Sequence, residues 1–445
     1  MSEVLWASAV AQGQMVKDGF LSAEELRAAV IENIQRLNPA INAVVIPLFD
    51  RPGSGVPMLL KDAGQELADT PHWVGVAALR EAGAVSSTTT ALAVKFEEAG
   101  FSFVGKGACP ALSNGVTTEP IGFEPTRNPW DLSRSAGGSS GGPAAAVASG
   151  MVPIAHGSDA TGSLRCPAAL CGVTTLNPTS GRIPSVPPAG QPPNEVWRDF
   201  VLARHAEDLI AAFSVLAHDV RHPSSRELRV GLLDHDPELD LPVHPDCAEG
   251  VRVAGRLLEA LGHHVEIGWP DGLNTLWARA AEPLNVVSDA TRPPVIRWLE
   301  DRLGRPVAPD ELDSRVFEAA GRASTRTADD LSRAQCALDA AVHPLAEWWG
   351  TFDLLVTPTT FQPAWPLGTD SGLIQMGTLL APFSLSGQPA LSLPLHRTPE
   401  KLPVGVQIVG RAGDDETLLA LAEQLQAASD WTLLRPPACM GDGGG

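Results

Sequence analysis

Residues 137–155 read GGSSGGPAAAVASGMVPIA, which joins a Gly/Ser-rich segment to a run of small residues and a short apolar run. Pro143 suits the first turn of a helix, so residues 143–149 are predicted to form one. Residues 152–155 are predicted to form a buried strand. A helix followed at once by a buried strand is typical of α/β proteins.

The same alternation continues on both sides of this stretch. Ser22 and Glu25 form a capping-box pattern at the start of a helix that Asn38 and Pro39 are expected to end. Further helices are predicted at 88–100, 247–261 and 415–429, and strands at 41–47, 101–104, 228–233, 264–267, 352–356, 390–394 and 404–409. We therefore predict an α/β fold with a large mixed β-sheet covered by helices on both faces.

The length of 445 residues allows two or three domains or one large unit. No repeat is visible, and the Pro-rich run at 184–193 is interpreted as a loop rather than a linker. We predict a single large domain over residues 1–440. Its core is expected at about 50–215 and 350–435, its helical substrate lobe at about 270–350, and a disordered tail at 441–445.

The composition narrows the classes of function. Lys and Arg total 32 and Asp and Glu total 52, so the formal charge is −20. Such an acidic surface repels phosphate backbones and anionic lipids, so neither nucleic acid nor a membrane is an expected partner. Two uncharged stretches, 136–158 and 374–395, are long enough to cross a membrane, but their glycines, serines and prolines favour a buried site region and a buried pair of strands.

The cysteines indicate reduced thiols. Six of them are scattered along the chain without a CxxC pair, which fits neither a disulfide scaffold nor a structural zinc site. No metal is therefore expected. The start, MSEV, lacks the basic residues and apolar core of a signal peptide, so we expect a cytoplasmic protein.

Residues 137–142, GGSSGG, have three interpretations from composition alone. Such a segment is commonly a flexible loop. A phosphate-binding loop is disfavoured, because GxGxxG and a Gly-Lys-Ser/Thr ending are both missing. The segment also fits GxSxG, a nucleophile elbow that His343 or His396 could complete as a triad. An elbow needs a strand directly before it, and residues 128–134 are predicted to be a loop.

Two further segments carry candidate chemistry. Residues 159–165, DATGSLR, have small residues that allow backbone N–H groups to converge on one point, either as an oxyanion site or in a simple tight turn. Lys61 ends the apolar run at 56–60, a position where lysine is commonly solvated. If it is buried instead, a pKa lowered by about 2–4 would make it a general base.

Together these segments resemble the amidase signature family. The likeness extends over nearly the whole chain, and segments 38–49, 116–120 and 155–160 resemble in particular the amidases of nylon oligomers. It implies the amidase signature fold and hydrolysis of an amide C–N bond. The segments that carry the family resemblance are 60–62 (LKD), 105–106, 126–130, 137–142, 159–169, 177–179, 355–359, 386–390 and 402–408.

The family uses a Ser–Ser–Lys relay, which the resemblance carries to this chain residue by residue. It implies that Ser163 is the nucleophile, that Ser139 bridges, and that neutral Lys61 is the base in an acyl-enzyme mechanism. The peptide between Gly138 and Ser139 is expected to be cis. No cofactor is implied. The backbone N–H groups expected to hold the oxyanion belong to Ala160, Thr161, Gly162 and Ser163.

The resemblance also suggests supporting residues. Asp159 and Arg165 are expected to brace the oxyanion loop, and Ser140 is expected to hydrogen-bond Lys61 or to cap the next turn. Asn114 stands where related amidases place a substrate-contacting Asn, although a buried loop amide fits equally.

The chain departs from the family pattern at several places, among them Pro143, where Ser is common, and Asn177, which replaces Lys. Residues 105–112, GKGACPAL, stand where the family usually has Gly-Lys-Thr-Asn. Thr161 replaces a usual Gly or Ala, and its larger side chain is expected to narrow the acyl pocket. These changes leave the three catalytic positions intact and leave the identity of the substrate open.

The substrate implied is a small linear or cyclic amide, and a homodimer is common in the family. One alternative is a glutaminase subunit of a tRNA-dependent amidotransferase, which the acidic charge and the nylon-type segments disfavour. The other alternative is a non-catalytic homologue that binds a small amide.

Overall fold

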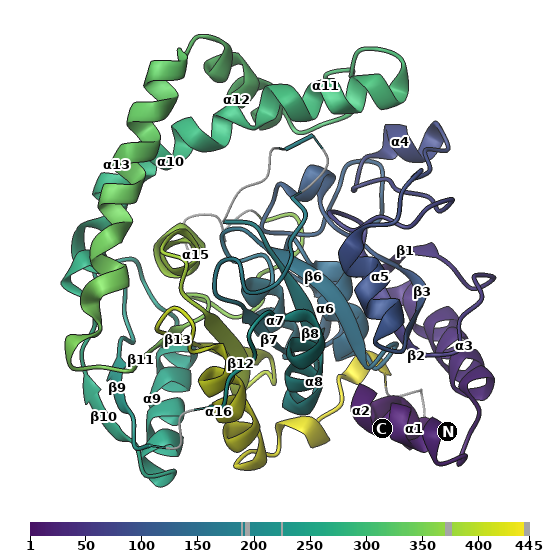
Figure 1. Ribbon diagram of the computed structural model, residues 1–445, viewed down its shortest axis with the longest axis horizontal. Helices are drawn as coiled ribbons and strands as arrows, with labels where there is room; N and C mark the ends of the chain where they lie inside the picture. Colours follow the sequence, from purple (N-terminus) through teal and green to yellow (C-terminus); the bar gives the residue numbers. More distant parts are fainter. Residues whose placement is uncertain (188–189, 192–195, 224–225, 370–375, 440–445) are drawn as a thin grey trace.

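The computed structural model describes residues 1–187, 190–191, 196–223, 226–369 and 376–439, and it centres on an 11-stranded β-sheet (Figure 1). The strand order is β1-β3-β2-β6-β8-β7-β12-β13-β11-β9-β10, and β4 pairs with β5 in a separate sheet. The strands are β1 (Val44–Pro47), β2 (Val56–Lys61), β3 (Phe101–Gly107), β4 (Arg127–Asn128), β5 (Asp131–Ser135), β6 (Ile154–Asp159), β7 (Thr174–Asn177), β8 (Arg198–Ala203), β9 (Arg229–Leu232), β10 (His264–Ile267), β11 (Leu354–Pro358), β12 (Ala390–Arg397) and β13 (Pro403–Gly410).

The main sheet is mixed, as predicted. β3, β2 and β6 are parallel neighbours, and so are β11, β9 and β10. Antiparallel pairs through β8, β7, β12 and β13 join these two groups. β6, β8 and β13 are buried at every residue. Because successive side chains of a strand point to opposite faces, both faces of the sheet are covered.

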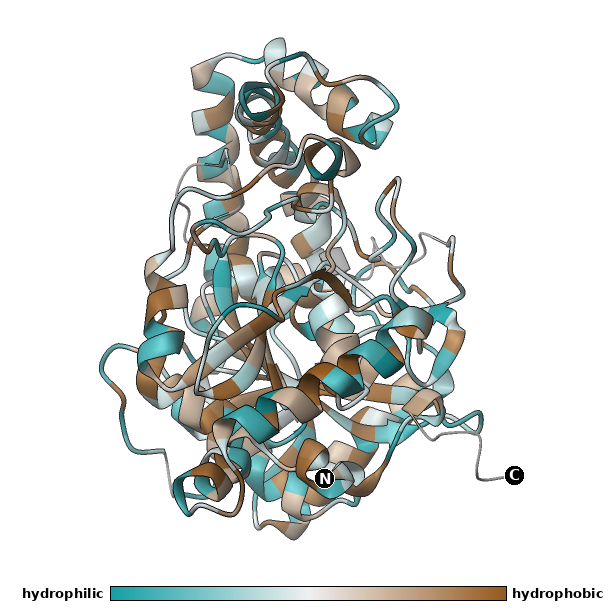
Figure 2. Ribbon diagram, turned by 90° about the vertical axis from the view of Figure 1, so that its right-hand side faces the viewer, coloured by the Kyte–Doolittle hydropathy of each residue, from teal (hydrophilic) through white to brown (hydrophobic). Residues whose placement is uncertain are grey.

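Helices form the covering layers and one arm. α6 packs beside α7, and α8 packs beside α16, in both cases against the centre of the sheet. α10–α13 form the arm, which lies at the top and left of Figure 1 and above the sheet in Figure 2. The helices are α1 (Ser2–Trp6), α2 (Ala9–Lys17), α3 (Ala23–Ile41), α4 (Ala77–Glu81), α5 (Ala91–Glu98), α6 (Gly141–Ala148), α7 (Arg165–Cys171), α8 (Ala206–Leu216), α9 (Pro245–Ala260), α10 (Leu276–Ala290), α11 (Arg292–Leu303), α12 (Ser314–Ser324), α13 (Ala328–Glu347), α15 (Ala381–Leu385) and α16 (Asp415–Ala427).

The first long helix begins as predicted and ends later. Ser22 and Glu25 form the complete capping box of α3. The expected end at Pro39 is wrong, because α3 continues through Pro39 to Ile41. Asn42 then takes a left-handed conformation, with φ 56°, which ends the helix in the manner usual for Asn.

Two strands near the Gly-rich segment differ from the prediction. The strand expected at 152–155 is β6, which runs on to Asp159 and so carries the polar residues His156, Ser158 and Asp159 at its end. Residues 128–134, predicted to be a loop, include β5, which pairs with β4 outside the main sheet.

The uncharged stretch at 374–395 is not a pair of strands. Its described part contains the helix α15 and one strand, β12. In the described residues, no helix combines the length and the apolar character needed to cross a membrane. The tail predicted at 441–445 lies outside the described residues.

Candidate active site

Two neighbouring parallel strands end at the candidate site. β2 ends at Lys61 and β6 ends at Asp159, with Leu59 paired to Ala155. Parallel strands present their carboxyl ends at the same edge of a sheet, where α/β proteins commonly build their sites. The side chains at the ends of β2 and β6 therefore lie close together.

Lys61 is completely buried in a polar pocket of hydroxyl groups. Its Nζ lies 2.7 Å from Ser139 Oγ and 2.9 Å from Ser158 Oγ. It also lies 5.7 Å from the centroid of the Trp197 ring. The loss of hydration on burial lowers the pKa of Lys61 to about 8, and this outweighs the opposing effect of nearby acidic side chains. About a tenth of the Lys61 amines are therefore neutral at pH 7.

Ser139 is buried in the loop that leads into α6. The peptide between Gly138 and Ser139 is cis, as the resemblance implied. A Cβ atom on Gly138 would lie 2.8 Å from the carbonyl oxygen of Thr117. Only glycine fits this close approach of two backbone segments at position 138.

Ser140 does not have either of the contacts expected for it. Its Oγ accepts the N–H of Ser158 and donates to the Ser158 carbonyl, both at 3.2 Å. It neither bonds Lys61 nor caps α6 through its side chain. Ser140 instead joins the Gly-rich loop to the end of β6.

Ser163 lies in the turn before α7, next to the Gly-rich loop. Its carbonyl oxygen accepts the N–H of Ser140 at 3.2 Å. Ser163 is 8 % exposed, whereas Ser139 and Lys61 are fully buried. In the described part of the chain, no group hydrogen-bonds Ser163 Oγ. Among the described side chains, Lys61 and Ser139 are therefore in direct contact, and Ser163 is joined to the Gly-rich loop through its backbone.

The loop at 159–165 has free backbone donors. The N–H of Gly162 is engaged, because it donates to Asp159 Oδ1 at 2.5 Å. Gly162 has a φ of 128°, a conformation that favours glycine. The N–H groups of Ala160, Thr161 and Ser163 have no acceptor among the described residues. These three donors remain for an anion.

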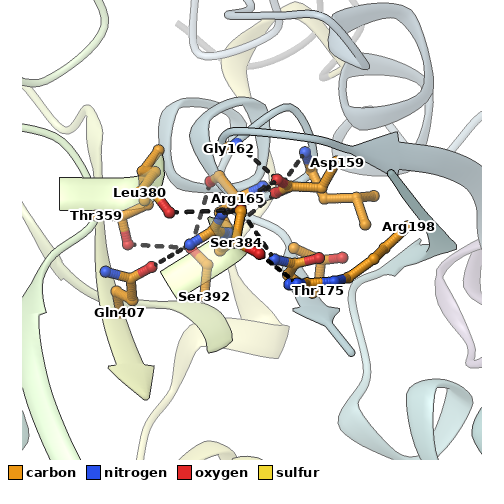
Figure 3. A network of polar contacts seen from close by, with 12 residues as sticks. Asp159, Gly162, Arg165, Thr175, Arg198, Thr359, Leu380, Ser384, Ser392 and Gln407 are labelled. Atoms are coloured by element: carbon orange, nitrogen blue, oxygen red, sulfur yellow. Dashed lines mark hydrogen bonds and ion pairs between the residues drawn. The ribbon is translucent and has the colours of Figure 1, made fainter. Parts of the chain in front are cut away.

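Asp159 and Arg165 form a buried ion pair that holds this loop (Figure 3). The Arg165 Nε lies 3.0 Å from Asp159 Oδ2, and its Nη2 lies 3.1 Å from Asp159 Oδ1. Nη1 donates to Gln407 Oε1 and Nη2 to Ser384 Oγ, each at 2.6 Å. Burial of the Asp159 carboxyl raises its pKa, but the Arg165 guanidinium outweighs this and holds the pKa of Asp159 below its usual value. The carboxylate therefore stays ionised and keeps its contacts with the loop.

Arg165→Met is expected to destabilise the protein by about 3–5 kcal/mol, because it leaves the Asp159 carboxylate buried and unpaired. Urea unfolding followed by circular dichroism measures this. Arg252→Met is the matched control, since the half-exposed ion pair of Arg252 with Asp234 contributes at most about 1 kcal/mol. Equal losses in both variants would contradict the role given to the buried pair.

Sequence reasoning missed Ser158 on β6, and it interpreted His156 on the same strand as a satisfied core histidine, which it is. His156 Nδ1 accepts the backbone N–H of Lys61 at 3.3 Å, and His156 Nε2 lies 3.0 Å from Asp199 Oδ1. Ser158 accepts from Lys61 Nζ. The two residues share one face of β6, because side chains two residues apart in a strand point the same way. A strand predicted as far as Asp159 would have indicated Ser158 as well.

In the described residues, the Asn114 side chain makes no hydrogen bond to the lysine or to either serine. Its Oδ1 accepts from Arg292 Nη2 at 2.9 Å, and no described residue of the relay contacts it. The alternative triad is also not assembled. In the described residues, His343 contacts Glu347 and His396 contacts Asp246, and neither contacts Ser139 or Ser163.

A search of protein-family models matches residues 50–419 to the family described as Amidase. The 6-aminohexanoate-cyclic-dimer hydrolase of Paenarthrobacter ureafaciens is 35% identical, over 98% of this chain and 98% of its own. The enzyme of the same name from Pseudomonas sp. (strain NK87) is 34% identical with the same coverage. The solved structure of 6-aminohexanoate cyclic dimer hydrolase complexed with substrate has a TM-score of 0.91 and 34% identity, and the match covers 98% of this chain and 100% of that one.

Proposed function

Because this chain belongs to the amidase family and is an amide hydrolase that acts on C–N bonds, we propose that it works through a Ser–Ser–Lys relay and an acyl-enzyme. The observation that carries the proposal is the 2.7 Å contact between Lys61 Nζ and Ser139 Oγ in a fully buried setting. A lysine in this environment has a low enough pKa to act as a base.

In the proposed reaction, Ser163 Oγ attacks the amide carbonyl. Its proton passes to Ser139 as the Ser139 proton passes to the neutral amine of Lys61. The same path returns a proton to the leaving nitrogen when the C–N bond breaks. Water then attacks the acyl-enzyme and releases the acid and free Ser163. The 8 % exposure of Ser163 supports its role as nucleophile, since Ser139 and Lys61 have no exposed surface.

The oxyanion of the tetrahedral intermediate is proposed to bind the N–H groups of Ala160, Thr161 and Ser163. Each such donor typically contributes about 3–4 kcal/mol of barrier lowering. Gly162, initially grouped with them, has its N–H on Asp159 Oδ1 and is proposed to shape the loop instead. Asp159 and Arg165 are proposed to hold the donors in place.

The substrate is proposed to be a small linear or cyclic amide. The support is the identity of 34–35% to hydrolases of 6-aminohexanoate cyclic dimer over nearly the whole chain. The six unpaired cysteines support a cytoplasmic location, where thiols remain reduced.

A fluorophosphonate probe tests the proposed nucleophile. We expect the probe to modify Ser163, as found by peptide mapping, and the label to be lost in Ser163→Ala. A folded protein without label would favour the non-catalytic amide binder. A label on Ser163 together with glutamine hydrolysis, and co-purification with a second subunit, would favour the glutaminase.

The rate should rise with pH as Lys61 loses its proton. With a pKa of about 8, kcat/KM for a neutral amide is expected to increase about fifty-fold from pH 6 to pH 8 and to level off above pH 9. Ser158→Ala should move this rise to lower pH, because Ser158 Oγ stabilises the charged amine. A flat profile between pH 6 and pH 9 would exclude Lys61 as the base.

A further inference from the structure

The backbone of Lys61 is held by a side chain of the neighbouring strand. The described pairing between β2 and β6 ends at Leu59 and Ala155. Two residues further on, the backbone N–H of Lys61 donates to His156 Nδ1 at 3.3 Å. An imidazole thus accepts this N–H where a strand carbonyl would usually do so. The contact fixes the end of β2 at the residue whose amine contacts Ser139.

The ring of His156 is fixed on three sides. Besides the contact with Lys61, its Nε2 lies 3.0 Å from Asp199 Oδ1, and its ring meets the ring of Phe96 edge-on at 6.2 Å between centroids. Because Nδ1 accepts a backbone N–H, it carries no proton. The two contacts therefore assign a neutral imidazole with its proton on Nε2, where it donates to Asp199.

Asp199 is a buried carboxylate with neutral partners. Its Oδ1 accepts from His156, its Oδ2 accepts the N–H of Val186 at 2.9 Å, and its own N–H donates to Ser185 Oγ at 2.9 Å. Both oxygens act as acceptors, as in an ionised carboxylate. In the described residues, no Lys or Arg lies within ion-pair distance of it. The negative charge of Asp199 is thus not offset by a bound cation.

Three groups that can carry negative charge act on the amine of Lys61, namely Cys109, Asp199 and Asp159. Burial raises the pKa of the Cys109 thiol to about 12, so this thiol is uncharged at neutral pH. Asp159 is bound by two nitrogens of Arg165, whose positive charge offsets its own. Of the three groups, Asp199 therefore acts on the amine with the least compensation.

We propose that His156 and Asp199 are positioning residues for Lys61. His156 fixes the backbone of Lys61 against β6, and the Asp199 carboxylate stabilises the ammonium that forms when Lys61 accepts the proton of Ser139. Neither residue takes part in the proton transfer, because His156 Nδ1 stays bound to the Lys61 N–H and the Nε2 proton stays on Asp199. This inference rests on the proposed function, since it assigns supporting residues to the base of the relay.

Asp199→Asn tests the role of the charge. With the charge removed, burial lowers the pKa of Lys61 further, so the midpoint of the rise of kcat/KM with pH should fall by about 0.5–1 pH unit. The rate above the midpoint should fall about 3- to 30-fold, because a less basic amine accepts the proton less readily. Asp199→Ser removes the same charge without an amide N–H beside Val186, and it should show the same shift.

Asp208→Asn is the matched control. Asp208 is also buried, its Oδ1 also accepts a backbone N–H, that of Val10, and in the described residues it forms no ion pair. Its loss changes the net charge equally and should leave the pH profile and the rate unchanged. Thermal unfolding checks that the variants are folded. An equal shift in the Asp199 and Asp208 variants would overturn the proposal, and so would an unshifted midpoint in both Asp199 variants.

Two substitutions of His156 test the contact with the backbone. His156→Leu removes the acceptor of the Lys61 N–H and should lower kcat/KM at pH 8 by about 10- to 100-fold. His156→Asn can still accept this N–H through Oδ1 and should recover most of the loss. The midpoint of the pH profile should stay at the wild-type value in His156→Asn, because Asp199 keeps its charge. Equal losses in the two variants would overturn the role of His156.

A titration of Lys61 by NMR separates this inference from the proposed function. The chain has few lysines, so ¹³Cε-labelled lysine gives a simple spectrum, and the Lys61 signal is the one lost in Lys61→Met. The lysines are Lys17, Lys61, Lys95, Lys106 and Lys401. In Ser163→Ala, the Lys61 signal should titrate near pH 8, and at lower pH once Asp199→Asn is added.

The NMR titration needs no turnover. A lower midpoint with Asp199→Asn supports the role of Asp199 even if the wild type cleaves no amide. Hydrolysis that depends on Lys61 but not on His156 or Asp199 leaves the relay standing and removes the positioning pair.

Discussion

Ser163→Ala is expected to lower the rate of amide hydrolysis by about 10⁵-fold, because the variant has no group at position 163 that can form an acyl-enzyme. Ser139 cannot replace it, since its side chain is fully buried and occupied with Lys61. The measurement is a single-turnover assay on a small amide, with mass spectrometry to detect the acylated protein. The wild type should accumulate an adduct on Ser163 and the variant should form none.

Ser149→Ala is the control for this experiment. Ser149 is also buried close to α6, and its Oγ donates only to the carbonyl of Ala146, so its loss should leave hydrolysis unchanged. Thermal unfolding of both variants separates a loss of chemistry from a loss of fold. Turnover of Ser163→Ala within tenfold of the wild type would show that another residue is the nucleophile.

Lys61→Met is expected to lower kcat/KM by about 10³- to 10⁴-fold at pH 7, with a smaller effect on stability. Methionine fills nearly the same space, so the variant removes the amine without opening a large cavity. The proton of Ser163 then has no acceptor beyond Ser139. The label from a fluorophosphonate should also form more slowly by a similar factor, because the same proton must leave Ser163.

Ser158→Ala distinguishes the relay from general packing around Lys61. This variant removes the second hydroxyl partner of Nζ and leaves the contact with Ser139 in place. We expect it to retain activity within about tenfold of the wild type and to differ mainly in its pH dependence. A loss as large as that of Lys61→Met would mean that the whole hydroxyl pocket, rather than the amine, carries the effect.

Local patterns predicted much of the fold. The capping box at Ser22 and Glu25 marked the start of α3, and the alternation of apolar runs indicated a mixed sheet. The errors arose where tertiary contacts override local signals. α3 continues past Pro39 to its cap residue Asn42, whose carbonyl accepts from Thr126 Oγ1, 84 residues away. Ser135, the last residue of β5, donates its N–H to the carbonyl of Trp365. Neither condition is visible in a window of a few residues.

The candidate site was predictable only in part for a similar reason. Lys61, Ser139 and Ser163 belong to short motifs, so their positions followed from the resemblance. Ser158 was missed because the strand that carries it was predicted too short.

The bonds of Arg165 to Ser384 and Gln407 have a consequence for synthesis. Those partners lie 219 and 242 residues further along the chain. A nascent polypeptide that has just emerged as far as residue 350 already contains the lysine and both serines, yet it lacks the acceptors that set the oxyanion loop. Premature termination products should thus be inert, and only a finished molecule would cleave amides in the cell.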